Sequence, residues 1–415
     1  MRLNIGLRAA RAARANRPRS PGLIVVALLA SAPVFAQSFP GYAIDLRAVL
    51  EHDDGKFLWF HPRACAIPGS KGHVVMTLQK HLQQSDYYSG LHVMHSRDAG
   101  ATWSAPDPRP ELDWRVGPAG ETIAVCDVTP GWHAPTARML AIGVKVRYRD
   151  GVQLLDEPQS HAAAYAVYNP AGDSWSEWQF VEMPDPSGKF FLTTPGCVQW
   201  LVEPDGSLLV PFYFAAKDVG RFTASVMRCR FDGTSLSYVE HGDELSLEIE
   251  RGLVEPSLTR SKGRYYLTLR NDVKGYVTAG NDGLHFDAIR PWTFDDGAEL
   301  GSYNTQQHWV THSDGLFLAY TRRGANNDHI MRNRAPLFVA QVDPGSLRVI
   351  RSTERILMPE RGATLGNFGV CNISPAETWV TDAEGVWDDN ARARGAKGAT
   401  FIARILWQGP NELAK

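Results

Sequence analysis

The stretch Ser96–Trp103, with the pattern Ser-x-Asp-x-Gly-x-Thr-Trp, constrains the fold of this chain more than any other segment. Gly100 can adopt the positive φ that a tight hairpin turn requires. Asp98 can fold its carboxylate back onto backbone N–H groups of the same turn, and nearby hydroxyls can add hydrogen bonds. Trp103 then begins the next strand and buries a large ring under the turn. These residues predict a β-hairpin.

Two weaker segments repeat parts of this pattern. Asn169–Trp175 keeps a turn, an acid and a closing Trp, and Thr278–Phe286 keeps Asp-Gly with Phe in place of Trp. Ser96–Trp103 resembles the Asp-box, or BNR repeat, of the sialidase (neuraminidase) superfamily, where it closes the hairpin between the outer strands of a propeller blade. The series indicates a repeated unit of about 40–50 residues. In that family the box is structural, so it predicts fold and not chemistry.

Apolar runs alternate with turn clusters beyond Gln37, and no long segment has the 3.6-residue period of a helix. The strand-like runs are His73–Leu78, Gly90–His95, Met139–Val146, Ala162–Tyr168, Ser207–Phe214, Arg264–Leu269, Leu316–Tyr320, Leu337–Val342 and Phe401–Trp407. Many short strands predict an all-β protein. With the resemblance, we expect one domain over 37–415, a six-bladed β-propeller with antiparallel four-stranded blades. The pattern alone also fits a β-sandwich.

The segment 1–36 has the features of a signal peptide. Its first part carries six arginines and no acid, and the apolar run Gly22–Ala36 ends in a small-x-small site before Gln37. A helix of that length spans about 22 Å, which is short of a bilayer core of about 30 Å. We therefore expect cleavage rather than an uncleaved anchor, and a periplasmic or secreted protein.

The charge of the chain argues against a nucleic-acid partner. The formal net charge is −2, and it becomes −8 once the six leader arginines are removed. Nucleic acids favour a basic surface. We also expect no membrane span after cleavage, and a monomer.

The five cysteines have no close paired spacing and therefore do not predict a zinc site. They are Cys65, Cys126, Cys197, Cys229 and Cys371. Buried free thiols are favoured, while one or two disulfides stay open for an exported chain. No metal or other cofactor is expected, and the question of structural calcium stays open.

Charged residues also resemble the sialidase active site, in the same order along the chain. Phe60–Pro68 resembles the family's early Arg-Ile-Pro region, with Arg63 at the position of its arginine. Some twenty residues later, Leu82–Tyr88 lies where sialidases carry their acid/base aspartate, and Asp86 is the match.

The resemblance continues in the second half of the chain. Gly252–Ser257 resembles the family's Glu-Pro/Glu-Ser motif, with Glu255 as its glutamate. The next strand-like run ends at Arg270, which matches the second arginine. The third arginine matches Arg334, with Arg332 in reserve.

Simple chemistry explains why such residues would gather. Three converging guanidiniums bind a carboxylate through forked, charge-assisted hydrogen bonds. A carboxylic acid across the pocket protonates the leaving oxygen and later activates water, the role implied for Asp86. A glutamate beside a tyrosine raises its nucleophilicity, the role implied for Glu255, and a neutral tyrosine avoids repulsion from an anionic sugar.

One position departs from the family. Phe368, within Gly366–Val370, stands where the nucleophilic tyrosine is expected, and it has no hydroxyl. Either another tyrosine reaches the anomeric carbon or water attacks directly, and Tyr303 is the predicted substitute. His133 lies in a turn beside a Trp and is a candidate sugar-binding residue, although a hydrogen-bonded structural histidine is favoured.

Three functions follow. The first is an exported, exo-sialidase-like glycoside hydrolase that removes a terminal acidic sugar, sialic acid or a relative, from glycans. The second is a polysaccharide lyase on uronate-containing glycans, in which His133 or Tyr303 abstracts the C5 proton. The third is a non-catalytic carbohydrate-binding propeller. The hydrolase is the first hypothesis, and the missing tyrosine strengthens both alternatives.

Overall fold

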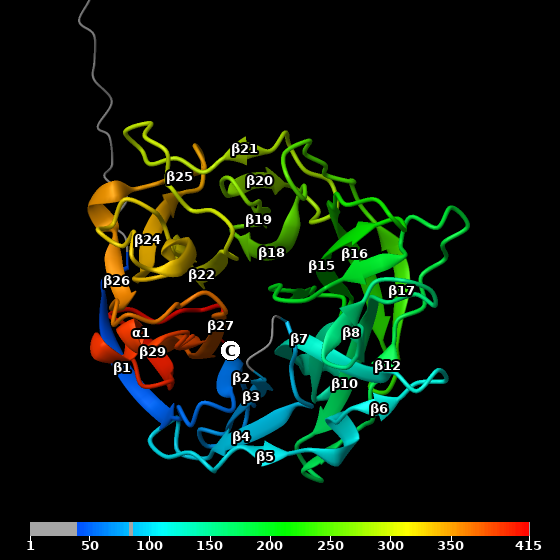
Figure 1. The fold of residues 1–415 in the computed structure, drawn as a ribbon. Coiled ribbons are helices and arrows are strands. Elements are labelled where there is room, and N and C mark those ends of the chain that lie inside the picture. The colour runs from blue at the N-terminus through cyan, green and yellow to red at the C-terminus, as the bar shows by residue number, and fades with distance from the viewer. Residues whose placement is uncertain (1–39, 83–85, 415) are drawn as a thin grey trace, which may run out of the picture. The chain divides into compact units, whose positions relative to one another are not determined.

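In the computed structural model, which describes residues 40–82 and 86–414, the strands form antiparallel sheets arranged around a centre (Figure 1). The predicted leader 1–36 lies outside the described residues. Every strand-like run predicted from the sequence overlaps a strand, so the all-β, antiparallel propeller expectation is confirmed. The described residues include no helix with the length and apolarity needed to traverse a bilayer.

Six sheets contain all of the named strands. The first holds β2 (Leu58–Ala66), β3 (Val74–His81), β4 (His92–Ser96) and β5 (Asp107–Pro108). The second holds β6 (Arg115–Val116), β7 (Thr122–His133), β8 (Arg138–Arg149), β9 (Val152–Leu154), β10 (Ala162–Asn169), β11 (Ser174–Trp175) and β12 (Gln179–Phe180). The third holds β13 (Leu192–Thr194), β14 (Leu201–Val202), β15 (Leu208–Ala215), β16 (Thr223–Phe231) and β17 (Leu236–His241).

The remaining sheets follow in chain order. The fourth holds β18 (Val254–Ser261), β19 (Arg264–Arg270), β20 (Tyr276–Gly280) and β21 (Arg290–Pro291). The fifth holds β22 (His308–His312), β23 (Gly315–Tyr320), β24 (Leu337–Asp343), β25 (Arg348–Val349) and β26 (Arg355–Met358). The sixth joins β27 (Gly369–Ser374), β28 (Glu377–Ala383) and β29 (Ala399–Trp407) to β1 (Tyr42–Glu51).

The helical elements are short. They are α1 (Asp389–Ala393), η1 (Pro110–Leu112), η2 (Ala134–Thr136), η3 (Met331–Asn333) and η4 (Arg351–Thr353).

The sixth sheet closes the ring. β1, from the start of the described chain, pairs antiparallel with β29 from its end, from Tyr42 opposite Trp407 to Glu51 opposite Ala399. The two ends of the chain therefore hold the ring shut with ordinary ladder hydrogen bonds.

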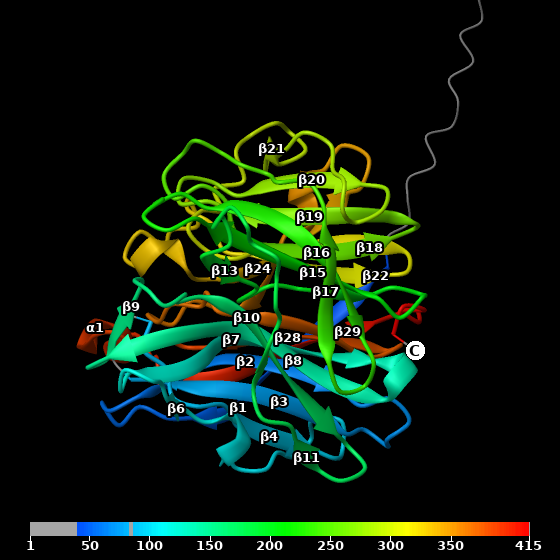
Figure 2. The same cartoon turned by 90° about the vertical axis from the view of Figure 1, so that its right-hand side faces the viewer.

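Apolar clusters fill the interfaces between consecutive sheets, including the interface between the sixth sheet and the first. In that last interface Trp59 of β2 and Trp379 of β28 are buried in one cluster. Because both faces of each sheet are covered, the strands read as nearly continuous apolar runs rather than alternating ones, as in β23, where all six residues are buried. Figure 2 shows the sheets stacked side-on.

The turn predicted at Ser96–Trp103 joins the third and fourth strands of the first sheet. The Asp98 carboxylate accepts hydrogen bonds from the Thr102 hydroxyl (2.6 Å) and backbone N–H (2.9 Å), which lower its pKa from 3.8 to about 2. Gly100 takes a φ of +81°. Trp103 lies partly buried against Trp379, with ring centroids 6.1 Å apart, and the next strand begins later, at Asp107.

A related turn follows β10, β16, β20 and β24 and leads into the outer strands β11, β17, β21 and β25 of four further sheets. In each, an Asp or Asn side chain accepts hydrogen bonds from backbone N–H groups just ahead of it, at Asn169, Asp232, Asp282 and Asp343. The sequence pattern identified two of these four. The sixth sheet has no such turn because its third and fourth strands are the two ends of the chain.

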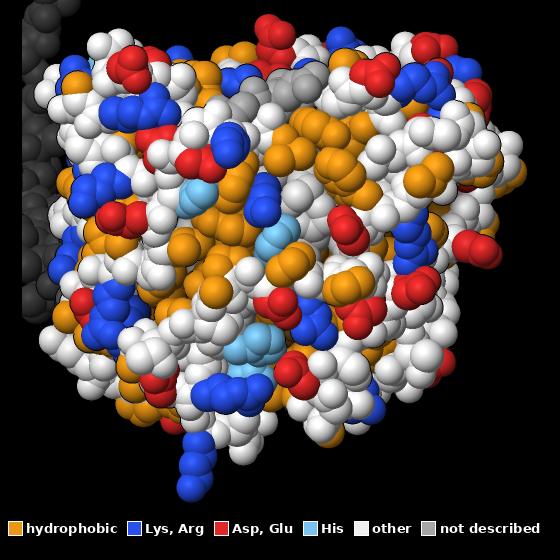
Figure 3. All heavy atoms as spheres, turned by 60° about the horizontal axis from the view of Figure 1, so that its bottom comes forward, with side chains coloured by type: hydrophobic (Ala, Val, Ile, Leu, Met, Phe, Trp, Pro, Cys, Tyr) orange, Lys and Arg blue, Asp and Glu red, His pale blue; other side chains and the backbone are white. Residues whose placement is uncertain are grey.

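The outer surface is mixed in charge. Over the face drawn in Figure 3, acidic and basic side chains alternate with apolar ones, and histidines lie among them. The mixture of both charge signs on this face is consistent with the small formal net charge of the chain.

Candidate functional site

A cavity of about 1000 Å³ is lined by residues on the strands or adjoining loops of all six sheets. Its lining includes Asp86, Glu255, Arg270, Arg332 and Arg334, which are five of the residues predicted from the sequence. Residues separated by almost 250 positions therefore meet at one site, which fits a concave ligand pocket.

The cavity floor is built by an unusual backbone feature that repeats from sheet to sheet. His61, Asp127, Cys197, Glu255 and Asn304 all have positive φ, between 43° and 57°, and all line the cavity. The first, second and fourth of these lie in breaks of the strand register, at β2–β3, β7–β8 and β18–β19. Such bulges turn a side chain out of the normal alternation. Non-glycine residues in this region cost about 1–3 kcal/mol each, and such residues cluster at functional sites.

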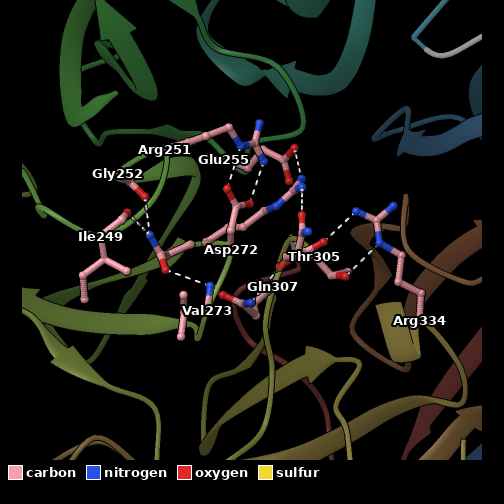
Figure 4. Close-up of polar contacts among 12 residues, drawn as sticks. Ile249, Arg251, Gly252, Glu255, Asp272, Val273, Thr305, Gln307 and Arg334 are labelled. Atoms are coloured by element: carbon pink, nitrogen blue, oxygen red, sulfur yellow. Dashed lines mark hydrogen bonds and ion pairs between the residues drawn. The ribbon is translucent and has the colours of Figure 1, made fainter. Parts of the chain in front are cut away.

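Glu255 and Arg270 form an ion pair within the cavity. Their side chains are 16% and 9% exposed, and Arg270 also donates to Asn304 Oδ1 over 2.6 Å. Burial works against the charge of Arg270, but the Glu255 carboxylate outweighs burial and raises its pKa. Nearby, Arg251 donates two hydrogen bonds of 2.7 Å to Asp272. Figure 4 shows Arg251, Asp272 and Glu255 side by side.

Arg334 differs from Arg270 in its counter-charge. It donates to Thr305 Oγ1 over 2.9 Å and to the Asn304 carbonyl over 2.6 Å, and within residues 40–82 and 86–414 it forms no ion pair with a carboxylate (Figure 4). Burial, followed by repulsion from Arg270 and Arg332, lowers its pKa to about 9. A guanidinium in this situation attracts an anion from outside the protein.

The predicted acid, Asp86, is exposed and faces the same cavity. Its backbone is held by the hydroxyl of Tyr148, which donates to the Asp86 carbonyl over 2.5 Å. Tyr213, on β15, also lines the cavity. Burial, with the charges of Glu255 and Asp127, raises the pKa of Tyr213 well above 10.0. The cavity therefore holds an acid, a glutamate and a tyrosine influenced by that glutamate.

Arg63 was predicted to hold a substrate carboxylate, but its side chain lies beneath the cavity and is not part of its lining. It is 2% exposed and donates to the Val128 carbonyl over 3.2 Å and to Gln306 Oε1 over 3.3 Å. The bulge at Phe60–Arg63 turns His61 toward the cavity and places Arg63 under it. In the cavity, Arg332 stands beside Arg270 and Arg334 instead.

Tyr303 also lies away from the cavity lining. Its hydroxyl donates to Asn333 Oδ1 over 2.7 Å, and the Arg323 guanidinium lies 3.9 Å above its ring. These contacts engage both the hydroxyl and a ring face, so Tyr303 fits a structural role better than the predicted nucleophile.

His133 is a structural histidine. It is 1% exposed, and its two ring nitrogens meet Thr136 Oγ1 at 2.8 Å and the Gly206 carbonyl at 2.9 Å. It lies at the end of β7 rather than beside Asp127 in the middle of that strand, and it is not part of the cavity lining. These contacts fit the structural role favoured from the sequence, and the sugar contact at this residue stays a prediction.

Phe368 packs in the apolar core between the fifth and sixth sheets and is fully buried. Its ring meets His308 edge-on, with centroids 5.1 Å apart. The preceding residue, Asn367, lines the cavity. The segment predicted to carry the nucleophile thus reaches the cavity, but it presents an amide.

Many cavity residues were not predicted from the sequence, among them His61, Asp127, Cys197 and Tyr213. Burial, partly offset by the Arg63 charge, raises the pKa of Asp127 to about 6. His61 Nε2 lies 3.2 Å from Asp127 Oδ1. His61 was within a segment already singled out, but nothing in the local pattern marked the other three. All five cysteines are free, as favoured from the sequence.

No family model matches the chain, and no curated protein sequence matches it. Its fold is similar to that of a protein of unknown function from Dyadobacter fermentans, with 13% identity over 88% of this chain and 99% of that chain and a TM-score of 0.60. It is also similar to the Trypanosoma rangeli sialidase, with 15% identity over 88% of this chain and 59% of that chain and a TM-score of 0.57. A Hadza microbial sialidase gives 14% identity over 89% and 69%, with a TM-score of 0.60.

At these identities the likeness shows the fold alone. The chain has an all-β propeller fold of the kind found in solved sialidases. It spans 59% of the length of the Trypanosoma rangeli enzyme, so the activity of that protein does not transfer with the fold.

Proposed function

We propose that the protein is an exported, sialidase-like glycoside hydrolase that removes a terminal acidic sugar from glycans. The observation that carries this proposal is the Arg334 guanidinium. It faces the cavity beside Arg270 and Arg332 and has no carboxylate partner among the described residues. An acidic sugar would supply the missing carboxylate, and the fixed forks of the guanidiniums would orient it.

The chemistry is assigned to residues on the same cavity. Asp86 is exposed and free to approach the glycosidic oxygen, so it would act as general acid and then as base. Tyr213 replaces Tyr303 as the proposed nucleophile, because it lines the cavity and because the charge of Glu255 contributes to its raised pKa. Glu255 would accept the phenolic proton as the tyrosine attacks the anomeric carbon.

A product assay tests this function. The purified protein is incubated with a panel of sialosides and uronate-terminated oligosaccharides, and the products are identified by mass. We expect a released acidic monosaccharide, with the rate lowered about 10²–10⁴-fold in Asp86→Asn. Tyr213→Phe should lower kcat with little change in KM, while the matched variant Tyr303→Phe should retain activity.

Two other results would overturn the proposal. A product lighter by one water than the hydrolysis product would indicate a lyase, in which the arginines neutralise a uronate carboxylate. Unchanged substrates with measurable binding would indicate a carbohydrate-binding propeller that has lost its chemistry with the tyrosine at the Phe368 position.

Two further assignments belong with this proposal. We count the six sheets as six blades, because an apolar cluster fills each interface around the ring. We also identify the Ser96–Trp103 turn as an Asp-box, because its carboxylate and glycine make the contacts that the motif predicts. Mass analysis of the exported protein, with Gln37 expected as its first residue, tests the proposed leader.

A further inference from the structure

Three cavity residues bring a nitrogen, an oxygen and a sulfur donor together. The donor atoms of His61, Asp127 and Cys197 all lie within 4.8 Å of one another. They come from three consecutive sheets: the bulge of β2, the bulge of β7 and the segment between β13 and β14. His61 and Cys197 are each 3% exposed, so the cluster sits at the cavity floor.

The backbone holds these side chains in place. All three residues have positive φ, of 53°, 57° and 57° in chain order. The Cys197 N–H donates to the Asp127 carbonyl over 3.0 Å, which ties the second and third donors together. Left-handed backbone at three neighbouring positions is costly, and a ligand shared by the three side chains would explain why it is kept.

We propose that His61, Asp127 and Cys197 bind a divalent transition-metal ion, with zinc the best match, and leave one coordination position open toward the cavity. Zinc accepts imidazole nitrogen, thiolate sulfur and carboxylate oxygen, and zinc sites with three protein ligands keep a fourth position for water or substrate. Calcium and magnesium prefer oxygen ligands alone, so this donor set does not suit them.

Zinc bonds of about 2.0–2.3 Å place tetrahedral ligands about 3.3–3.7 Å apart. The 3.2 Å between His61 Nε2 and Asp127 Oδ1 lies just below this range, and the three donor atoms are within 4.8 Å of one another, so small side-chain rotations would bring them into one set. On binding, the Cys197 thiol loses its proton to solvent and the sulfur forms the metal bond. An ion there would polarise a ligand oxygen in the cavity that holds Arg334.

The metal proposal does not rest on the proposed hydrolase activity. Purified protein is stripped with a chelator, dialysed and loaded with Zn²⁺, and bound metal is counted by mass spectrometry. We expect one equivalent per chain. Cys197→Ser and His61→Gln should each weaken binding by more than about 100-fold, since even loss of an outer-shell partner costs 10–100-fold.

A matched control and a spectrum keep the test specific. Cys126→Ser alters another buried thiol of the same cavity and should keep the full equivalent. Co²⁺ loaded into the unmodified protein should show thiolate charge-transfer and tetrahedral bands, which are lost in Cys197→Ser while circular dichroism is unchanged. Absence of stoichiometric metal in the unmodified protein, or an unchanged Co²⁺ spectrum in Cys197→Ser, would overturn the proposal and leave an ion-paired floor beside Arg63.

Discussion

Arg270 and Arg334 occupy one cavity but differ in their counter-charges, and replacement by Met should separate them. Arg270 is paired with Glu255, and both side chains are largely buried. Arg270→Met leaves the Glu255 carboxylate without its counter-charge. Breaking a buried ion pair in this way costs about 3–5 kcal/mol. Because both side chains keep some exposure, 9% and 16%, we expect a loss of about 3 kcal/mol, the lower end of that range.

Arg334→Met should cost far less. The pKa of Arg334 is lowered from 12.5 to about 9, so below pH 9 the folded state is destabilised by holding this charge. Converting the whole pKa shift into free energy gives a destabilisation of about 5 kcal/mol. The side chain is partly exposed, so we expect about half of that value. Losing the hydrogen bonds to Thr305 and Asn304 costs about 1 kcal/mol each. The two effects nearly cancel, so stability should stay within about 1 kcal/mol of the unmodified protein.

Urea unfolding at pH 7, followed by tryptophan fluorescence, measures both changes from midpoints at constant slope. A sugar acid at 100 times its Kd should stabilise the unmodified protein by about 2.7 kcal/mol and neither variant. Arg251→Met is the control, since its half-exposed pair with Asp272 is worth about 1 kcal/mol or less. Equal destabilisation in Arg334→Met and Arg270→Met would refute the reasoning, because Arg334 would then be a structural group rather than an unpaired charge.

Three further predictions concern the scaffold. Burial raises the pKa of the Asp382 carboxyl from 3.8 to about 7. The stability contributed by its protonated form is therefore complete below about pH 4 and is lost as the pH rises through 7. Asp382→Asn should raise the urea midpoint at pH 8 and leave it unchanged at pH 4. Gly100→Ala should lose about 2–4 kcal/mol in the same assay, because φ is +81° and the new Cβ would lie 2.5 Å from the Trp379 ring; a smaller loss would mean that the turn shifts freely. Deleting Tyr42–Glu51 should give aggregates on size-exclusion chromatography, because β29 is left with an open edge, whereas a monomer with unchanged melting would contradict ring closure by β1.

The scaffold was predictable because its signals are local. A strand needs only a short apolar run, and a turn needs only a glycine and a short acid at fixed positions. The turns at Asp232 and Asp343 were missed because neither is followed by the aromatic residue that closes Ser96–Trp103. Both carboxylates nevertheless accept backbone N–H hydrogen bonds within their turn, from residues two and three positions on, as Asp98 does from Thr102 four positions on. The carboxylate turn is thus the shared unit, and the aromatic residue is an addition to it.

The site was only partly predictable, and the bulge in β2 shows why. Strand alternation places side chains on opposite faces with a period of two residues, and a bulge shifts that alternation by one. The register break between Phe60 and Arg63 therefore turns His61 toward the cavity and Arg63 beneath it, which no period in the sequence reveals. Asp127 and Glu255 follow the same rule in β7 and β18.

These bulges depend on the closed ring. An isolated hairpin could relax a left-handed residue by slipping its register, but each inner strand here is packed between its neighbours. Cys197 N–H donates to the Asp127 carbonyl, and Leu258 N–H donates to the Gln199 carbonyl, so consecutive sheets are also joined by backbone hydrogen bonds. Opening the seam between β1 and β29 would free the inner strands to relax. The cavity should therefore lose ligand or metal binding in urea before the sheets themselves unfold.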